Sequence, residues 1–427
     1  MVATDSGIRG FKVDRGYPKV SGERPTTELK PTNDGFPSML TLRRHVLPSV
    51  LAVLLLSATA CTSESAAGAR PNFLPEEVTS SPGSGATSTD PSIAAPRLGP
   101  ASAVDARGVL EDFKGRGMVE HMEALQRVAD DNDGNRASGT TGYEDSARYV
   151  EDQLRAAGYT PVRQKFTHRP NDERVETFNI LADTEGSAEN TIVVGAHLDS
   201  VEDGPGINDN ASGVAAVLET ARWMKETGVQ PANRVRFAFW GAEEDDLDGS
   251  RHYVDELSAA EVRRTALYIN VDMAASPNGV RSIHDGDGSD FEEAGPKGSQ
   301  EIEDVLFRFF EANSLPAETT PFDGGSDYEP FLRAGIPGGG LFTGDVESKS
   351  KAQMQAYGGV AGKDLDSCYH RPCDTISNTN ADLLKEMSAA LAYATATYAM
   401  APRAEPRDPG WREGGRPCTV TKAAAPR

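Results

Sequence analysis

The chain has 427 residues, of which 65 are Asp or Glu and 43 are Lys or Arg, giving a formal net charge of −22 at pH 7 and an isoelectric point near 4.8. Nucleic acids and anionic membrane surfaces are bound through basic patches, so this charge balance argues against both as partners. The length allows two or three ordinary domains, although large α/β proteins often form one.

The N-terminal 60 residues contain a targeting pattern that begins at Met39. Residues 1–38 mix Gly, Pro, Lys, Arg and Asp without periodicity, and we interpret them as a mis-assigned upstream segment, because signal-bearing chains normally start at a basic region. Arg43 and Arg44 precede an apolar run at 46–60, too short to span a bilayer comfortably. This pattern predicts a secretory signal peptide over residues 39–60.

The end of this segment, Ser-Ala-Thr-Ala-Cys at 57–61, resembles a bacterial lipobox, with Ala58 where Leu is more usual. The resemblance implies cleavage before Cys61 and diacylation of its sulfur and new amino group. An exported lipoprotein, held on the outer face of the cell membrane only through this lipid anchor, is therefore expected. Plain secretion after cleavage nearby is the alternative.

Low-complexity sequence follows as far as residue 104. Residues 61–104 are rich in Ser, Thr, Ala, Gly and Pro, a composition that cannot bury a core, and we interpret them as a disordered tether behind the lipidated cysteine. A disordered tail without a task is the alternative. Folded sequence is expected over 105–402, and the Pro-, Arg- and Gly-rich residues 403–427 are expected to form a flexible tail.

Strands and helices alternate through the predicted folded part. Helical periodicity and alternating apolar residues predict helices at 118–129 and 143–157, strands at 161–166, 175–182 and 191–196, a helix at 211–227, a strand at 235–240, a helix at 249–257, a strand at 267–271, a helix at 301–312, a strand at 338–342 and a helix at 381–398. We find no internal repeat and no inserted second domain. This order predicts an α/β fold with three α/β/α layers and a central mixed, mostly parallel sheet.

The most informative stretch is residues 191–213, a β-branched run followed by His197, Asp199 and a Gly/Pro loop that leads to Asp209. Positions i and i+2 of an extended segment face the same way, so Asp199 can accept a hydrogen bond from a metal-ligating His197 and orient it. Asp209 stands just ahead of a predicted helix, and taken alone it is better explained as a helix N-cap. The rest of the chain favours a metal ligand instead.

Two other predicted strands also end in carboxylates. Glu243 and Glu244 follow the strand that ends at Trp240, and Asp272 directly follows the strand that ends at Val271. Taken singly, the glutamates fit a solvated acidic loop, but a carboxylate ending an apolar strand needs a partner. Since open α/β sheets bind ligands beyond the carboxyl ends of their strands, these side chains are expected to converge with His197.

A short cysteine loop carries another candidate histidine. In an exported protein, Cys368 and Cys373 are expected to form a disulfide that fixes Tyr369 and His370 between them. Cys418 has no evident partner and is interpreted as free or intermolecular. The other histidines lack a matching carboxylate context, and we interpret them as structural or surface residues: His121, His168, His252 and His284.

Together these candidates form a metal-ligand set with two imidazoles and three carboxylates, which suits zinc: His197, Asp209, Glu244, Asp272 and His370. The set exceeds what one catalytic zinc needs, so we expect two Zn²⁺ per chain with Asp209 bridging them. A further carboxylate must then remain off the metals to move a proton. Glu243 is the evident choice for this general base.

The motifs that carry these residues resemble the co-catalytic di-zinc aminopeptidases of the secreted bacterial leucyl aminopeptidase type. They are His-Leu-Asp-Ser at 197–200, Gly-Ile-Asn-Asp-Asn-Ala-Ser-Gly at 206–213, Phe-Trp-Gly-Ala-Glu-Glu at 239–244, Asn-Val-Asp-Met at 270–273, Gly-Gly-Leu-Phe-Thr-Gly at 339–344 and Cys-Tyr-His-Arg-Pro-Cys-Asp at 368–374. The similarity covers roughly residues 105–400. It implies a zinc-exopeptidase fold, a catalytic domain over 105–402, and hydrolysis of the N-terminal residue from peptides with a free N-terminus.

The resemblance also assigns roles to the candidates. It places His197 and Asp272 on one zinc, Glu244 and His370 on the other, and Asp209 on both. It implies that Glu243 is the general base, that Tyr369 donates a hydrogen bond to the tetrahedral intermediate, and that carboxylates near Glu243 and Asp272 hold the substrate ammonium with backbone around 325–327.

Two departures from the family pattern stand out. Gly325 replaces the arginine of an Asp-Gly-Arg-Ser-Asp motif, and Lys385 and Ala389 stand where some relatives carry calcium ligands, so no such calcium site is expected.

A carboxypeptidase or amidohydrolase on the same scaffold is the main alternative and would need a cationic clamp, for which Arg281, Arg333 and Arg371 are candidates. A glutaminyl cyclase is a weaker alternative, because its chemistry needs only one metal and the sequence carries ligands for two. A non-catalytic peptide-binding lipoprotein would need neither Glu243 nor Tyr369.

Overall fold

The computed structural model describes residues 104–113, 116–170 and 173–402. The predicted signal peptide, Cys61, the tether, the tail and Cys418 lie outside these ranges. Within them, no helix has the length and apolar composition needed to cross a membrane.

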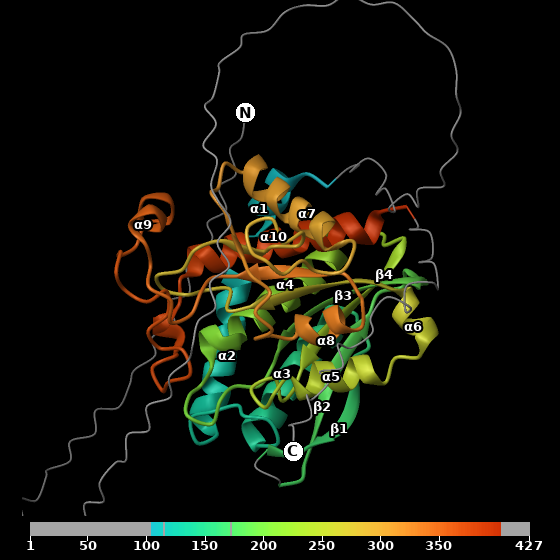
Figure 1. Cartoon of the computed structure of the whole chain (residues 1–427). Coiled ribbons are helices and arrows are strands. Elements are labelled where there is room, and N and C mark those ends of the chain that lie inside the picture. Colours follow the sequence, from blue (N-terminus) through green and yellow to red (C-terminus); the bar gives the residue numbers. More distant parts are fainter. Residues whose placement is uncertain (1–103, 114–115, 171–172, 403–427) are drawn as a thin grey trace, which may run out of the picture. The chain divides into compact units, whose positions relative to one another are not determined.

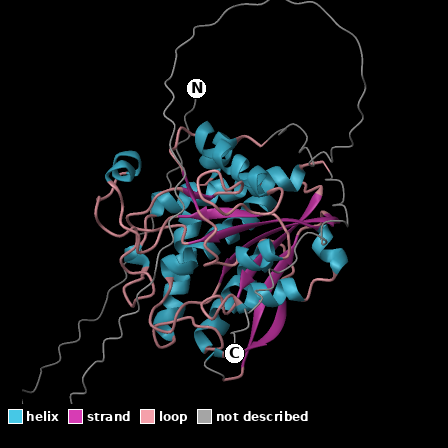
Figure 2. Ribbon diagram, viewed as in Figure 1, coloured by secondary structure: helices cyan, strands magenta, loops and turns pink. Residues whose placement is uncertain are grey.

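Helices and strands alternate along most of the described chain (Figures 1 and 2). The helices are α1 (Ala106–Asp112), α2 (Arg116–Asp131), α3 (Thr141–Ala156), α4 (Ser212–Glu226), α5 (Asp248–Asp255), α6 (Ala259–Arg264), α7 (Ser299–Ala312), α8 (Tyr328–Arg333), α9 (Lys351–Tyr357) and α10 (Ala381–Met400). The strands are β1 (Val162–His168), β2 (Val175–Asp183), β3 (Ser187–His197), β4 (Asn233–Trp240), β5 (Thr265–Asp272), β6 (Ser282–His284), β7 (Glu318–Thr320) and β8 (Gly338–Phe342). A π-helical turn at Ile207–Ala211 and a 3₁₀ turn at Ile376–Asn378 complete the set.

The strands form one mixed sheet in the order β1-β2-β4-β3-β5-β8-β6-β7. Its centre is parallel, because β3 pairs in parallel with β4 and β5, and β5 with β8. Antiparallel pairs join β1 to β2, β2 to β4 and β6 to β8. The predicted mixed, mostly parallel sheet is therefore confirmed.

Two hydrophobic clusters cover the two faces of this sheet. Ile192 and Val194 of β3 face a cluster that includes residues of α1, α2, α3, α4, α7 and α10, whereas Val193 faces a second cluster with residues of α5 and α8. Burial on both sides explains why β3 reads as a continuous apolar run rather than an alternating one. The structure thus has the three predicted α/β/α layers (Figure 1).

Strand register brings the candidate residues to one edge. His197 pairs with Trp240 of β4, and Asp272 pairs with Phe342 of β8. Since these central strands are parallel, their carboxyl ends lie together, and the loops that follow them carry Glu243, Glu244 and Gly344.

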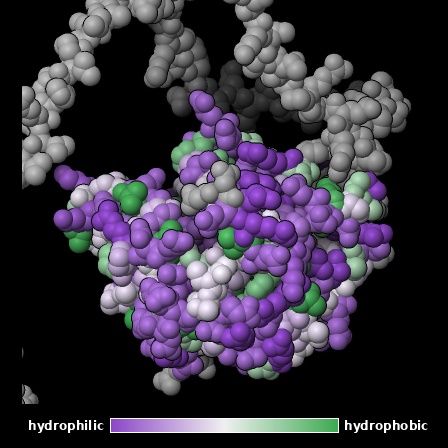
Figure 3. Space-filling model, turned by 90° about the horizontal axis from the view of Figure 1, so that it is seen from below, coloured by the Kyte–Doolittle hydropathy of each residue, from purple (hydrophilic) through white to green (hydrophobic). Residues whose placement is uncertain are grey.

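Several short elements were not predicted, notably the strands β6 and β7 and the helix α8. Three-residue strands are too short to show a period, so only their long-range pairing defines them. Thr140 is the N-cap of α3, and its side chain accepts a hydrogen bond from the amide of Tyr143. The face of the described chain shown in Figure 3 is largely hydrophilic, with single apolar residues scattered over it.

Candidate active site

Asp209 lies at the centre of the site, between two imidazoles. Its Oδ1 is 3.1 Å from Nε2 of His197, and its Oδ2 is 3.1 Å from Nε2 of His370. The N-cap residue of α4 is Ala211, with no side-chain cap bond, so the N-cap interpretation of Asp209 is wrong. The π-helical turn that precedes α4 directs the Asp209 carboxylate toward the two histidines instead.

The other candidate carboxylates gather around this pair. Oδ1 of Asp272 is 3.3 Å from Nε2 of His197, and its Oδ2 accepts a 2.6 Å hydrogen bond from Ser326. Oε2 of Glu244 is 3.0 Å from Nε2 of His370. Oε2 of Glu243 lies farther away, 3.9 Å from Nε2 of His197. Side chains from three strand ends and one distant loop therefore converge, as the sequence predicted.

Asp199 lies behind His197 and is fully buried. Its Oδ1 is 3.6 Å from Nδ1 of His197, on the side of the ring away from Asp209. The backbone amides of Glu243 and Glu244 each donate to this carboxylate at 3.3 Å. At this distance Nδ1 of His197 has no hydrogen-bond partner among the described residues, so what the structure shows is that Asp199 fixes the loop that carries the two glutamates, a role that the sequence did not indicate.

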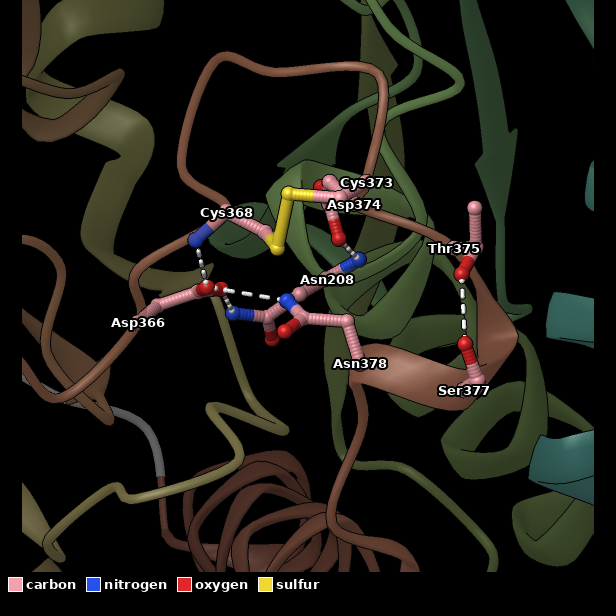
Figure 4. Close-up of a disulfide and its surroundings, with 8 residues drawn as sticks. All are labelled: Asn208, Asp366, Cys368, Cys373, Asp374, Thr375, Ser377 and Asn378. Atoms are coloured by element: carbon pink, nitrogen blue, oxygen red, sulfur yellow. Dashed lines mark hydrogen bonds between the residues drawn. A yellow bond between two sulfur atoms is a disulfide. The ribbon is translucent and has the colours of Figure 1, made fainter.

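The disulfide loop is tied to the turn that carries Asp209 (Figure 4). Cys368 and Cys373 form the predicted bond, with Cα atoms 5.3 Å apart. Asp374 accepts hydrogen bonds from the backbone amides of Asn208 and Asp209 at 2.8 and 3.0 Å. These bonds join the loop that carries His370 to the turn that carries Asp209.

Tyr369 is stacked on His370, with ring centroids 3.8 Å apart and an interplanar angle of 24°. It lines the same pocket as Asp209, Glu243 and Asp272. Burial, followed by the charges of neighbouring carboxylates, raises the pKa of its hydroxyl, so Tyr369 stays protonated and able to donate.

A buried arginine that the sequence did not reveal supports the loop between β3 and Asp209. Arg136 donates to the carbonyl oxygens of Pro205 at 2.9 Å, Gly206 at 2.6 Å and Leu198. Burial lowers its pKa to about 10, and the Asp199 carboxylate opposes that shift, so the guanidinium remains charged at neutral pH. No local pattern distinguishes this arginine, because its partners are backbone groups far along the chain.

Arg136→Met is expected to lower the free energy of unfolding by about 3 kcal/mol, because three buried carbonyl groups lose their donor. Urea denaturation followed by circular dichroism measures this loss. Arg127→Met, on the exposed face of α2, is the matched control. Equal stability of the two variants would contradict the assigned role.

Crowded buried carboxylates dominate the electrostatics of the site. Burial raises the pKa of Glu244 to about 7, with Asp209 adding to the effect, and burial also raises that of Glu243. Burial opposes protonation of His370, but its hydrogen bonds to Asp209 and Glu244 raise its pKa to about 10. Positive charge close to such a cluster stabilises its ionised form.

The donor set fits divalent cations of the zinc type. Around Asp209, imidazole nitrogens and carboxylate oxygens lie as close to one another as the ligand atoms of one metal ion. His197 belongs to two such groups, one with Glu243 and Asp272 and the other with Asp209 and Glu244. Oε1 of Glu244 is buried without a hydrogen-bond partner. In the described part of the chain, no lysine or arginine bonds to these carboxylates.

The site opens into a pocket with a volume of about 510 Å³. Its walls include Leu247, Met273, Tyr328 and Phe342, beside many polar groups. His284 also lines this pocket, so its interpretation as a purely structural or surface histidine is incomplete. The other three set-aside histidines do not line it: His121 bonds Tyr149 and Glu219, His252 stacks on Phe166, and His168 is buried beside Asp245.

Solved structures with the same fold include an aminopeptidase from Aneurinibacillus sp. strain AM-1, with a TM-score of 0.54 and 19% identity over 71% of this chain and 99% of that one. A zinc aminopeptidase from Bacillus subtilis gives a TM-score of 0.55 and 18% identity over 66% of this chain and 94% of that one. At this level of identity the likeness shows the fold alone.

Sequence relatives are closer. Leupeptin-inactivating enzyme 1 of Streptomyces exfoliatus is 41% identical over 295 residues, 69% of this chain and 64% of that protein. An aminopeptidase of Pseudomonas aeruginosa strain UCBPP-PA14 is 49% identical over 224 residues, 52% of this chain and 41% of that protein. The chain thus spans less than two thirds of the length of these curated relatives. The model of peptidase family M28 matches residues 179–395, about half of the chain, and the chain belongs to that family.

Proposed function

We propose that this protein is a zinc aminopeptidase, a metal-dependent exopeptidase that hydrolyses the N-terminal residue from peptides with a free N-terminus. The observation that carries the proposal is the position of Asp209, whose two oxygens lie 3.1 Å from two different imidazoles inside a pocket lined by carboxylates. The two relatives above, named for aminopeptidase and leupeptin-inactivating activity, support the same class of reaction.

The contacts between the side chains support the ligand roles that the family resemblance implies. His197 and Asp272 would hold one zinc, Glu244 and His370 the other, and Asp209 would contribute one oxygen to each. When bound, two zinc ions would supply Lewis-acid polarisation of the scissile carbonyl and a lower pKa for the attacking water.

Glu243 is the proton carrier of the proposed reaction. It is buried, lines the pocket and stands farther from His197 than the proposed ligands Asp209 and Asp272 do. Burial raises its pKa, and a carboxylate with a raised pKa can take a proton from water and return it to the leaving amine near neutral pH. Glu243 and Asp272 would also attract the ammonium group of the substrate.

Tyr369→Phe is expected to lower kcat by about 10²-fold with little change in KM, because the lost hydroxyl would stabilise the oxyanion only in the transition state. Phenylalanine keeps the stacking on His370. Steady-state kinetics on leucyl anilide measures the effect. A variant with a raised KM and an unchanged kcat would indicate that the Tyr369 hydroxyl binds the substrate instead.

A carboxypeptidase would need a free cationic clamp, and the candidate arginines are engaged or lie elsewhere. Arg281 bonds Glu386 at 2.6 Å, and Arg333, which lines the pocket, pairs with Glu329. Arg371 is exposed and is not a pocket-lining residue. No observation therefore favours this alternative.

Hydrolysis of leucyl anilide by the purified, zinc-loaded protein tests the proposed function, with N-acetyl-leucyl anilide as the control for a free N-terminus. Turnover of the first substrate alone supports the proposal. If both are inert while a peptide with a free C-terminus is shortened from that end, the carboxypeptidase alternative holds. If no peptide reacts but peptides bind, the non-catalytic peptide-binding alternative holds.

We also infer export and lipidation at Cys61, on the sequence pattern alone. Incorporation of a labelled fatty acid into the expressed protein, and its loss in Cys61→Ser, is the expected result. Release of unlabelled wild-type protein into the medium would establish plain secretion instead.

A further inference from the structure

One part of the pocket wall, apart from the proposed zinc ligands, is rich in hydrogen-bond acceptors. It is formed by His284, Thr320, Asp323 and Asp345. We call these four residues the distal wall. They come from the end of β6, the end of β7 and the segments after β7 and β8, so only the folded sheet brings them together.

His284 is held as a neutral acceptor. Its Nδ1 lies 3.1 Å from the carbonyl oxygen of Pro321, which can only accept, so Nδ1 carries the hydrogen and Nε2 presents a lone pair. The ring is stacked on Phe322 at 5.0 Å and packs against Tyr328 at 4.6 Å, which fixes its orientation. Burial lowers its pKa to about 4. Within the described chain, no donor contacts Nε2, and this atom is not among those sealed from solvent.

The two distal carboxylates lack a cationic partner in the described part of the chain. Asp323 is positioned by the hydroxyl of Tyr328 at 2.5 Å and the amide of Gly325 at 2.9 Å, both on Oδ1. Oδ1 of Asp345 accepts from the amide of Glu347 at 3.2 Å. Neither carboxylate forms an ion pair with a described residue, and in both of them Oδ2 has no bond to a described donor.

The arginines elsewhere in the pocket wall are already compensated. Arg251 lies 3.4 Å from Asp248, and Arg333 pairs with Glu329. Two zinc ions would balance the four carboxylates of the centre, Asp209, Glu243, Glu244 and Asp272. The charge that then remains in the pocket is negative, and the lining carboxylates without a cationic partner among the described residues are Asp246, Asp323 and Asp345.

Apolar residues connect the centre to the distal wall. Met273 directly follows the proposed ligand Asp272, and Phe342 pairs with Asp272 across the sheet. Three residues after Phe342 the chain reaches Asp345. A side chain leaving the reacting residue would pass apolar groups first and acceptors afterwards, an order that suits an apolar stem with a cationic head.

We propose that the distal wall binds a long cationic side chain, that of lysine or arginine, on the N-terminal residue of the substrate. The proposal rests on the aminopeptidase function given above. The stem packs on Met273 and Phe342, and the head donates to Asp345, Asp323 and Nε2 of His284. Neutral residues of equal length lack the donors that these acceptors require.

Lysyl and norleucyl anilides differ only in the terminal ammonium and test this directly on the zinc-loaded protein. The expected preference, as a ratio of kcat/KM, is about tenfold for lysyl, because a charged group meets desolvated acceptors. Asp345→Asn and His284→Phe are expected to reduce this ratio about fivefold each. Asp131→Asn, an exposed change at the end of α2 that does not line the pocket, should leave it unchanged.

Calorimetric binding of lysinol and norleucinol, which have no scissile bond, gives a readout independent of turnover. Tighter binding of lysinol that Asp345→Asn removes supports the proposal even if no anilide reacts, in which case only the aminopeptidase function fails. Equal binding of the two amino alcohols, or turnover of leucyl anilide without a preference for lysyl over norleucyl, overturns the distal-wall proposal and leaves the aminopeptidase function standing.

Discussion

Glu243→Gln is expected to lower kcat by about 10³- to 10⁴-fold, because glutamine keeps the size of the side chain but cannot accept the proton of the attacking water. KM should change little. Glu243 stands 3.9 Å from His197, outside the shorter contacts of the proposed ligands. Steady-state kinetics with leucyl anilide measures the loss.

Glu244→Gln is the matched comparison for this experiment, since it differs by one position. Glu244 contacts His370 at 3.0 Å, so its variant should lose zinc, whereas Glu243→Gln should keep the zinc content and thermal stability of the wild type. If Glu243→Gln retains more than about a tenth of the activity at full zinc content, another group moves the proton and the assignment is wrong.

Candidates for the site could be found in the sequence because of how parallel strands end. The apolar runs before His197, Glu243 and Asp272 are local signals of strands. Because parallel strands end at the same edge of a sheet, the three separate motifs are predicted to lie together in the fold. The cysteine loop adds a short-range constraint. Such features need no knowledge of long-range packing, and each lies where the sequence pattern indicated.

Other parts of the site depend on long-range contacts and left no local signal. Arg136 reaches carbonyl groups 62 to 70 positions away, and His284 enters the pocket only because the short strand β6 pairs with β7 and β8. An arginine or histidine with such partners resembles any surface residue in the sequence. Asp209 shows the opposite problem, because its position before a helix suggested a capping role that the folded turn does not use.

Asp209→Ala is expected to reduce activity by more than about 10³-fold and to lower the zinc content from two ions per chain to one or none, because both proposed zinc ions share this carboxylate. Chelation of the wild type should produce the same loss, and added zinc should restore the wild type but not the variant. Elemental analysis after dialysis gives the stoichiometry.

Asp199→Ala is the control that separates a ligand from an orienting residue. Asp199 contacts the far side of His197 and the amides of Glu243 and Glu244, so its loss should weaken zinc binding about 10- to 100-fold while saturating zinc recovers part of the activity.

A fully active wild type with one zinc per chain would contradict the two-metal site. In that case Asp209 would act as a terminal ligand, and the contact between Asp209 and His370 would serve to hold the disulfide loop rather than a second ion.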